Sequence, residues 1–192
     1  MSDQKRVDME NLLGYRISMA LKGAETLIHD LVSNGGKPDD LFHNKRDLLG
    51  FQIGWLKPIN HKKICELAGI NPEKCEIVLM HAHSLTECHM HQKGGSTFLV
   101  LGETHGCKNP NGGILTATAE KGKTKYSLSD NKAFTGQLIK VPAGQIHAFY
   151  GNEQGGLSAL GFVYPKINTG ENEFDVVEYQ FIGNLNEVQI LN

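Results

Sequence analysis

The chain has 192 residues, a hydrophobic fraction of 40%, a charged fraction of 21% and a formal net charge of −2. This length allows one domain with a substantial core, or a compact domain that carries an extension. The small net charge gives no electrostatic reason to expect nucleic acid or an anionic membrane as a partner. No stretch approaches the roughly 18 apolar residues of a membrane span and the N-terminus has no apolar signal segment, so we expect a cytoplasmic protein.

Helical patterns occupy the start of the chain. Apolar residues recur at spacings of three and four over residues 9–32, and Gly35 and Gly36 follow as stop signals. This periodicity predicts an amphipathic helix. A proline, early acidic residues and a closing glycine predict a second, shorter helix within residues 37–50.

After residue 50 the sequence pattern changes from helical to extended, with one further helical segment. "FQIGWLKP" reads as extended, and "NHKKICELAG" predicts a further helix that closes on a glycine. From Cys75 onward, short β-branched or aromatic runs alternate with clusters of Gly, Asn, Pro and Asp, which is typical of a sandwich or barrel. We therefore predict a mainly β domain over residues 75–192, with residues 1–74 as an N-terminal α-helical extension packed on it.

The four cysteines show no CxxC spacing, and in a chain without a secretory signal we expect them to stay reduced. Cys88 stands directly before His89. Because side chains alternate along a strand, we expect Cys88 to face away from that histidine and to act in packing. The four are Cys65, Cys75, Cys88 and Cys107.

Histidine, with nine residues, is the residue type that stands out, and one of the nine ends a recognisable pattern. Gly136, Pro142, Gly144 and His147 stand in "GQLIKVPAGQIH". With the HxH pairs upstream, this resembles the cupin superfamily, whose second motif reads GxxxxxPxGxxH followed by an asparagine that is Gly151 here. The resemblance covers residues 76–182 and implies a double-stranded β-helix, or jelly-roll barrel, in which the motif histidine binds a metal ion.

The first cupin motif, HxH followed by a glutamate and a glycine, fits in two registers. In the upstream register His81 and His83 are followed by Glu87 and Gly94 at the family's spacings, so every letter matches. However, the six residues between that glutamate and that glycine should form an apolar barrel strand, and "CHMHQK" is unsuited to one.

In the downstream register His89 and His91 are the pair, and Gly102 falls at the right spacing, while Gly95 takes the place of the glutamate. Here "STFLVLG" supplies an apolar strand, and alternation along "CHMH" sends both histidines to one face. We favour this register. The resemblance then implies a metal site of His89, His91 and His147, with His81 and His83 as neighbours of the site or surface residues.

Three neutral histidines without a carboxylate leave a divalent ion its full charge and open positions for a small, anionic, chelating substrate. This ligand set is similar to that of the Fe(II) cupins that oxidise thiols or cleave diketones, so Fe(II) is the expected metal, with Mn, Ni and Zn as alternatives. Resemblance to the thiol dioxygenases implies a catalytic role for Tyr164 in "GFVYP". Phe162 replaces that family's histidine partner, and Arg46 is the only candidate for its substrate-anchoring arginine.

Other activities stay open at this point. The length and "LGFVYPKINTG" also resemble cupin sugar-phosphate isomerases, for which Glu87 or Glu103 would have to supply the carboxylate. A small-molecule-binding cupin without enzymatic activity is a third reading. In each case the expected partner is a small molecule, and because cupins commonly pair through exposed strands, we expect a homodimer.

Overall fold

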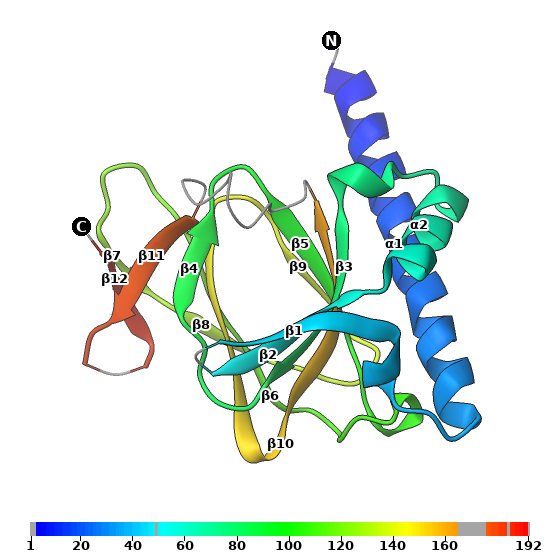
Figure 1. Ribbon diagram of the computed structural model, residues 1–192. Coiled ribbons are helices and arrows are strands. Elements are labelled where there is room, and N and C mark those ends of the chain that lie inside the picture. The colour runs from blue at the N-terminus through cyan, green and yellow to red at the C-terminus, as the bar shows by residue number, and fades with distance from the viewer. Residues whose placement is uncertain (1–2, 49, 165–175, 184, 192) are drawn as a thin grey trace.

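The computed structural model describes residues 3–48, 50–164, 176–183 and 185–191, and shows a β-barrel with a long helix along one side (Figure 1). The helices of this described part are α1 (Asp3–Ser33), α2 (Pro58–Leu67) and the short 3-10 segments η1 (Pro38–Leu41), η2 (Pro72–Lys74) and η3 (Glu103–His105). None of these helices has the length and apolarity that a membrane crossing requires.

The strands form two antiparallel sheets that share the long strand β10. Sheet A has the order β1-β2-β3-β10-β5-β9, and sheet B has the order β8-β6-β10-β4-β11-β12-β7. The strands are β1 (Phe42–Leu48), β2 (Phe51–Leu56), β3 (Glu76–Ala82), β4 (Cys88–His91), β5 (Gly95–Val100), β6 (Asn111–Thr118), β7 (Lys125–Ser127), β8 (Ser129–Lys132), β9 (Leu138–Val141), β10 (Gln145–Tyr164), β11 (Val176–Phe181) and β12 (Glu187–Ile190).

Successive strands of the barrel alternate between the sheets. β3 and β5 belong to sheet A, β4 and β6 to sheet B, and β10 pairs first with β6 and β4 and then with β3 and β5. This interleaving of antiparallel strands defines a jelly roll, which is the double-stranded β-helix. The predicted mainly β fold with an N-terminal helix is therefore confirmed.

The inward faces of the two sheets share one apolar core. Phe98 and Leu157 of sheet A meet Ile114 and Phe149 of sheet B, and the Phe98 and Phe149 ring centroids lie 4.8 Å apart. Strand alternation explains this, because every second residue of β5, β6 and β10 points into the barrel. This core lies next to the polar side chains placed on the same inward face.

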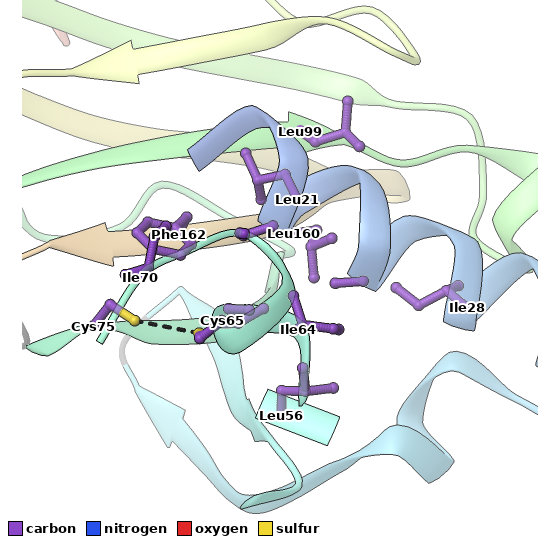
Figure 2. Close-up of a cluster of buried hydrophobic side chains, with 14 of the residues drawn as sticks. Leu21, Ile28, Leu56, Ile64, Cys65, Ile70, Cys75, Leu99, Leu160 and Phe162 are labelled. Carbon is purple, nitrogen blue, oxygen red and sulfur yellow. Dashed lines mark hydrogen bonds between the residues drawn. The ribbon is translucent and has the colours of Figure 1, made fainter. Parts of the chain in front are cut away.

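Helix α1 covers the outer face of sheet A. Leu21 and Ile28 of the helix pack against Leu99, Leu160 and Phe162 of the strands (Figure 2). The predicted amphipathic helix is confirmed.

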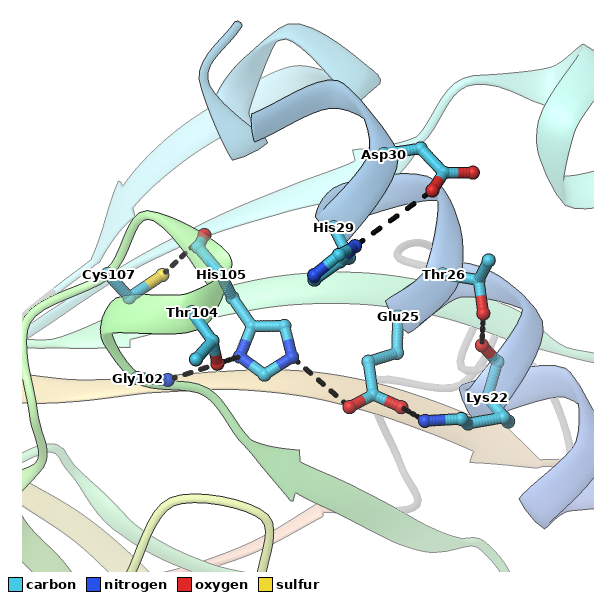
Figure 3. A network of polar contacts seen from close by, with 9 residues as sticks. All are labelled: Lys22, Glu25, Thr26, His29, Asp30, Gly102, Thr104, His105 and Cys107. Atoms are coloured by element: carbon cyan, nitrogen blue, oxygen red, sulfur yellow. Dashed lines mark hydrogen bonds and ion pairs between the residues drawn. The ribbon is translucent and has the colours of Figure 1, made fainter. Parts of the chain in front are cut away.

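A polar contact also anchors α1 to the barrel. Glu25 of the helix lies 3.1 Å from the buried imidazole of His105 in η3 (Figure 3). Since η3 follows β5 closely, this contact fixes the C-terminal half of α1 to the barrel.

The helix predicted within residues 37–50 is wrong. Only η1 is helical there, and the chain continues as β1, which pairs with β2 at the edge of sheet A. The polar run with Lys45 and Arg46 resembles the solvent face of a helix, yet its side chains are those of an exposed edge strand, where charges prevent pairing with other molecules. Part of residues 1–74 thus extends the sheet, while α2, predicted from "NHKKICELAG", is confirmed.

Candidate metal centre

Two neighbouring strands of sheet B bring three histidines together. His89 and His91 alternate along β4, so both point to the same face, and His147 of β10 is the register partner of His89. The ligand nitrogens of the three lie within 4.8 Å of one another. The structure thus brings together the three residues that the downstream register selects.

Backbone carbonyls orient two of these rings. His147 Nδ1 donates to the carbonyl oxygen of Gln145 at 3.0 Å, and His89 Nδ1 donates to that of Glu87 at 3.3 Å. A carbonyl only accepts, so these bonds place the proton on Nδ1 and leave the Nε2 lone pair for a ligand. Carbonyl partners of this kind commonly support metal-binding histidines.

Burial keeps two of the three imidazoles in the form that metals bind. It lowers the pKa of His89, and it lowers that of His147 well below its usual range, where the neighbouring charge of His89 acts in the same direction. Neutral imidazole is the ligand form, so the protein need not release protons from these groups before binding an ion.

The other face of β4 has no part in this centre. Cys88 and Met90 point away from the barrel and pack with Tyr126 and Val188 in a separate apolar cluster. Burial raises the pKa of Cys88 to about 12, so its thiol stays protonated and inert. The packing role expected for Cys88 agrees with this position.

The motif's glutamate position is crowded by the neighbouring backbone. A Cβ atom on Gly95 would lie 3.2 Å from the carbonyl oxygen of Val141, a tight contact, and 3.5 Å from Pro142 Cα, an ordinary van der Waals distance. Both are backbone atoms of the segment that leads into β10, so a side chain here would require that segment to shift by a few tenths of an ångström. The tight contact with Val141 favours glycine at this position.

Sequence reasoning missed one carboxylate beside the centre. Glu178 of β11 is the register partner of His89, and directly paired residues of antiparallel strands share a face. Its negative charge, with that of Glu87, raises the pKa of His89 and partly offsets the larger effect of burial. The signal was present in "FDVVEYQFIG", where the buried Tyr179 implies that its neighbour Glu178 faces the opposite side.

The strand order is that of a double-stranded β-helix, the fold that the resemblance to cupins implies. No known protein family matches the chain, and no curated protein matches its sequence.

One solved structure similar to this chain is Streptomyces Pac13, described as a nucleoside dehydratase. The two sequences are 13% identical, the match covers 75% of this chain and 89% of that chain, and the TM-score is 0.47. Another is the capsular polysaccharide assembling protein CapF of Staphylococcus aureus, with 12% identity over 69% of this chain and 32% of that chain, and a TM-score of 0.47. Vicilin from Solanum lycopersicum has 14% identity over 64% and 29%, with a TM-score of 0.43. These likenesses concern the fold alone.

The upstream histidines lie outside the three-histidine centre. His81 of β3 faces the outer side of sheet A, where its Nδ1 is 2.9 Å from Ser158 Oγ, and it lines a small cavity with Asp39 and Lys45. His83 is exposed, with its ring 6.5 Å from that of His81. The letter match of the upstream register therefore corresponds to no ligand cluster among the described residues.

The remaining sequence candidates are also placed elsewhere. Tyr164 is half-buried and packs against the cluster beneath α1, with Phe162 on the same face of β10, so the structure does not bring it to the three histidines. The stretch "PKINTG" that follows it lies outside the described residues. Arg46 lies over the Trp55 ring on the edge strand, and Glu103 accepts a hydrogen bond from Asn109 in the η3 region.

Proposed function

We propose that this cupin-type protein binds Fe(II) through His89, His91 and His147 and catalyses the O2-dependent oxidation of a small, chelating anion. One observation carries the proposal: three imidazoles converge within 4.8 Å on the inward side of the barrel, while Gly95 stands where the cupin motif places a carboxylate beside them. The donor set is neutral and consists only of nitrogen.

The chemistry of this donor set supports an anionic substrate. An ion held by three neutral ligands keeps a charge of 2+ and offers open positions to a substrate that binds through two atoms. A thiol with a neighbouring amine or carboxylate, or the enolate of a β-diketone, has this form. The other divalent ions that imidazole accepts, Mn, Ni and Zn, would occupy the same three ligands.

The residues around the centre would position the substrate and limit the access of water. The Phe149 ring lies 6.0 Å from the His147 ring and contacts Phe98, so the inner side of the centre is apolar. An apolar wall strengthens the electrostatic attraction between an anionic substrate and the centre. Glu178, on the face of His89, is the group best placed to accept a proton from a substrate thiol or enol.

Glu178 also supports a second candidate function. A carboxylate beside a divalent metal centre is the arrangement by which an isomerase moves a proton on a bound polyol. In that case Glu178 would take the role of the glutamate missing at residue 95, and the reaction would not consume oxygen.

Oxygen dependence separates the two candidates. Protein loaded with Fe(II) under anaerobic conditions is mixed with cysteine, mercaptopropionate or a β-diketone, and oxygen consumption is followed. We expect uptake with at least one of these anions, loss of uptake in His89→Ala and normal uptake in the matched His81→Ala. Turnover of a sugar phosphate without oxygen would replace the oxidation with the isomerase reaction, and loss of iron from His81→Ala but not His89→Ala would contradict the ligand assignment.

A further inference from the structure

A second group of metal-binding side chains lies on the helical side of sheet A. Its members are His61 and Cys65 of α2 and Cys75, which directly precedes β3, and their ligand atoms lie within 4.8 Å of one another. Figure 2 shows the sulfur atoms of Cys65 and Cys75 turned toward each other among the apolar side chains that pack beneath α1. Neither the barrel centre nor the proposed oxidation uses these residues.

The local path of the chain explains why the three residues meet. His61 and Cys65 are four residues apart on α2, so they project from the same face of the helix. The helix ends at Leu67, and Gly69, with φ +69°, adopts the left-handed conformation that reverses the chain. The short segment η2 then leads the chain back toward α2. Cys75 therefore lies beside the face of the helix that carries His61 and Cys65.

Two distances within the group are close to those of a zinc site. Cys65 Sγ lies 3.4 Å from Cys75 Sγ, and Cys75 Sγ lies 3.7 Å from His61 Nε2. With ordinary zinc bond lengths, two sulfur ligands of a tetrahedral site are ~3.8 Å apart, and a sulfur and a nitrogen ligand are ~3.6 Å apart. Two of the three edges of one tetrahedral face are thus close to these lengths, and the third pair of donor atoms, Cys65 Sγ and His61 Nε2, lies within 4.8 Å, so side-chain adjustments would complete the face.

Burial and charge also suit a bound cation. Cys65 and Cys75 are buried, with exposures of 0% and 1%, whereas His61 is only half-buried. An ion can therefore reach the group from the histidine side, where water can serve as the fourth ligand. Two thiolates neutralise a divalent charge, which removes most of the cost of holding the ion in apolar surroundings.

We propose that His61, Cys65 and Cys75 bind one zinc ion, with water as the fourth ligand. Thiolate donors select zinc over hard cations, whereas the barrel centre has no sulfur donor, so the two sites differ in the metal they favour. The zinc would join α2 to the start of β3 and thereby lock the helical layer onto sheet A. The proposal does not depend on the activity of the barrel.

Cobalt(II) distinguishes the two sites, because only a site with thiolate ligands gives a sulfur-to-cobalt charge-transfer band in the near ultraviolet. Reduced, metal-free full-length protein is titrated with Co2+ and then with Zn2+. We expect one equivalent of cobalt to produce the band and zinc to remove it. The band should remain in the His89→Ala/His91→Ala variant, in which the barrel centre is disabled, so failure of the barrel proposal would leave this result unchanged.

Substitution of the ligands completes the test. Because His61 is half-buried, His61→Ala should leave the fold intact while weakening zinc binding by at least about 100-fold, the upper end of what loss of a supporting partner costs. The matched controls Cys107→Ala and His29→Ala should bind zinc as the parent does. Absence of the band from protein whose cysteines titrate as thiols, or equal weakening of zinc binding in a control, would overturn the proposal.

Discussion

The two groups of metal-binding side chains differ in what holds their ligands in place. In the barrel centre, His89 and His147 face each other across paired strands, so their separation follows from the register of sheet B. In the helical group, His61 and Cys65 share one face of α2 and Cys75 returns through a short loop. The first arrangement depends on the whole barrel, whereas the second depends on local chain geometry and on the packing of the helical layer.

The two groups also differ in their donor atoms and in the charge of those donors. Imidazoles alone leave the charge of the ion uncompensated, which suits a centre that must attract an anion. Thiolates cancel that charge, which suits an ion that holds elements together. One molecule would thus contain a reactive centre on rigid strands and a cross-link on a layer packed against them, and changes confined to one region should spare the other.

The largest expected effect separates the two groups completely. His147→Ala removes a buried ligand that no other described histidine can replace, so iron that remains with the parent protein through gel filtration should be absent from the variant. The sulfur-to-cobalt band of the helical group should be unchanged. The control is His81→Ala, which alters a histidine on the outer face of β3 and should retain iron. Retention of iron by His147→Ala would show that the ligand set is incorrect.

A core substitution beneath α1 tests whether the helical group can be weakened while the barrel centre is unaffected. Phe162 is 1% exposed and packs against the helical layer, so Phe162→Ala should lower the free energy of unfolding by about 3–5 kcal/mol. Loosening of that layer should weaken zinc binding by the helical group while iron content per folded protein stays constant. Urea denaturation and metal analysis measure the two effects, and Phe134→Ala, at a residue 67% exposed, should change stability by less than about 0.5 kcal/mol.

A smaller effect is expected at the motif's glutamate position, Gly95. Gly95→Glu restores the motif by letter, but its Cβ would crowd the Val141 carbonyl, so the free energy of unfolding should fall by about 1–3 kcal/mol without tighter metal binding. In contrast, Gly14 of α1 has nothing near its added Cβ, and Gly14→Ala should stabilise the helix by up to about 1 kcal/mol. Tighter iron binding by Gly95→Glu would show that the barrel accepts a carboxylate after all.

Strand physics explains which parts of the fold and the barrel centre the sequence could predict. Alternation and apolar content identified β4 and β5 correctly, and therefore preferred His89 and His91 over an upstream pair that matched the motif by letter. The same rules could not identify β1, because the side chains of an edge strand are as polar as the exposed face of a helix. A pattern of polar and apolar residues indicates which side chains face solvent, but it does not show whether a helix or an edge strand carries them.

The features that the sequence could not predict depend on contacts between segments that are separated along the chain. Glu178 shares the face of His89 only because β11 aligns with β4, and Tyr164 lies away from the three histidines because the second half of β10 turns that side chain toward α1. Cys65 and Cys75 show no metal-binding spacing in the sequence, since a helix face and a return loop create their contact. Register and loop path are properties of the folded chain, and a single sequence carries only weak signals for them.

The smallest expected effect concerns the anchor of α1, which lies apart from both groups. Glu25 lies 3.1 Å from His105 and 2.6 Å from Lys22 (Figure 3). Burial alone would raise the pKa of Glu25, but hydrogen bonds from Lys22 and His105 outweigh it, and the pKa is lower than its ordinary value of 4.5. A lowered carboxyl pKa stabilises the fold above the ordinary value, and this contribution is lost as the pH falls through the lower value of the folded state.

Glu25→Gln should therefore cost about 1 kcal/mol of unfolding free energy at neutral pH, because the amide keeps the shape of the side chain but not its charge. Below the pKa of the folded state the parent carboxyl is itself neutral, so the difference between parent and variant should vanish there. Urea denaturation of both proteins from neutral pH to well below pH 4.5 measures this convergence. Glu66→Gln, which alters an exposed carboxylate on α2, should show no comparable difference at neutral pH. A penalty for Glu25→Gln that stays constant with pH would mean that Glu25 anchors α1 by shape and not by charge.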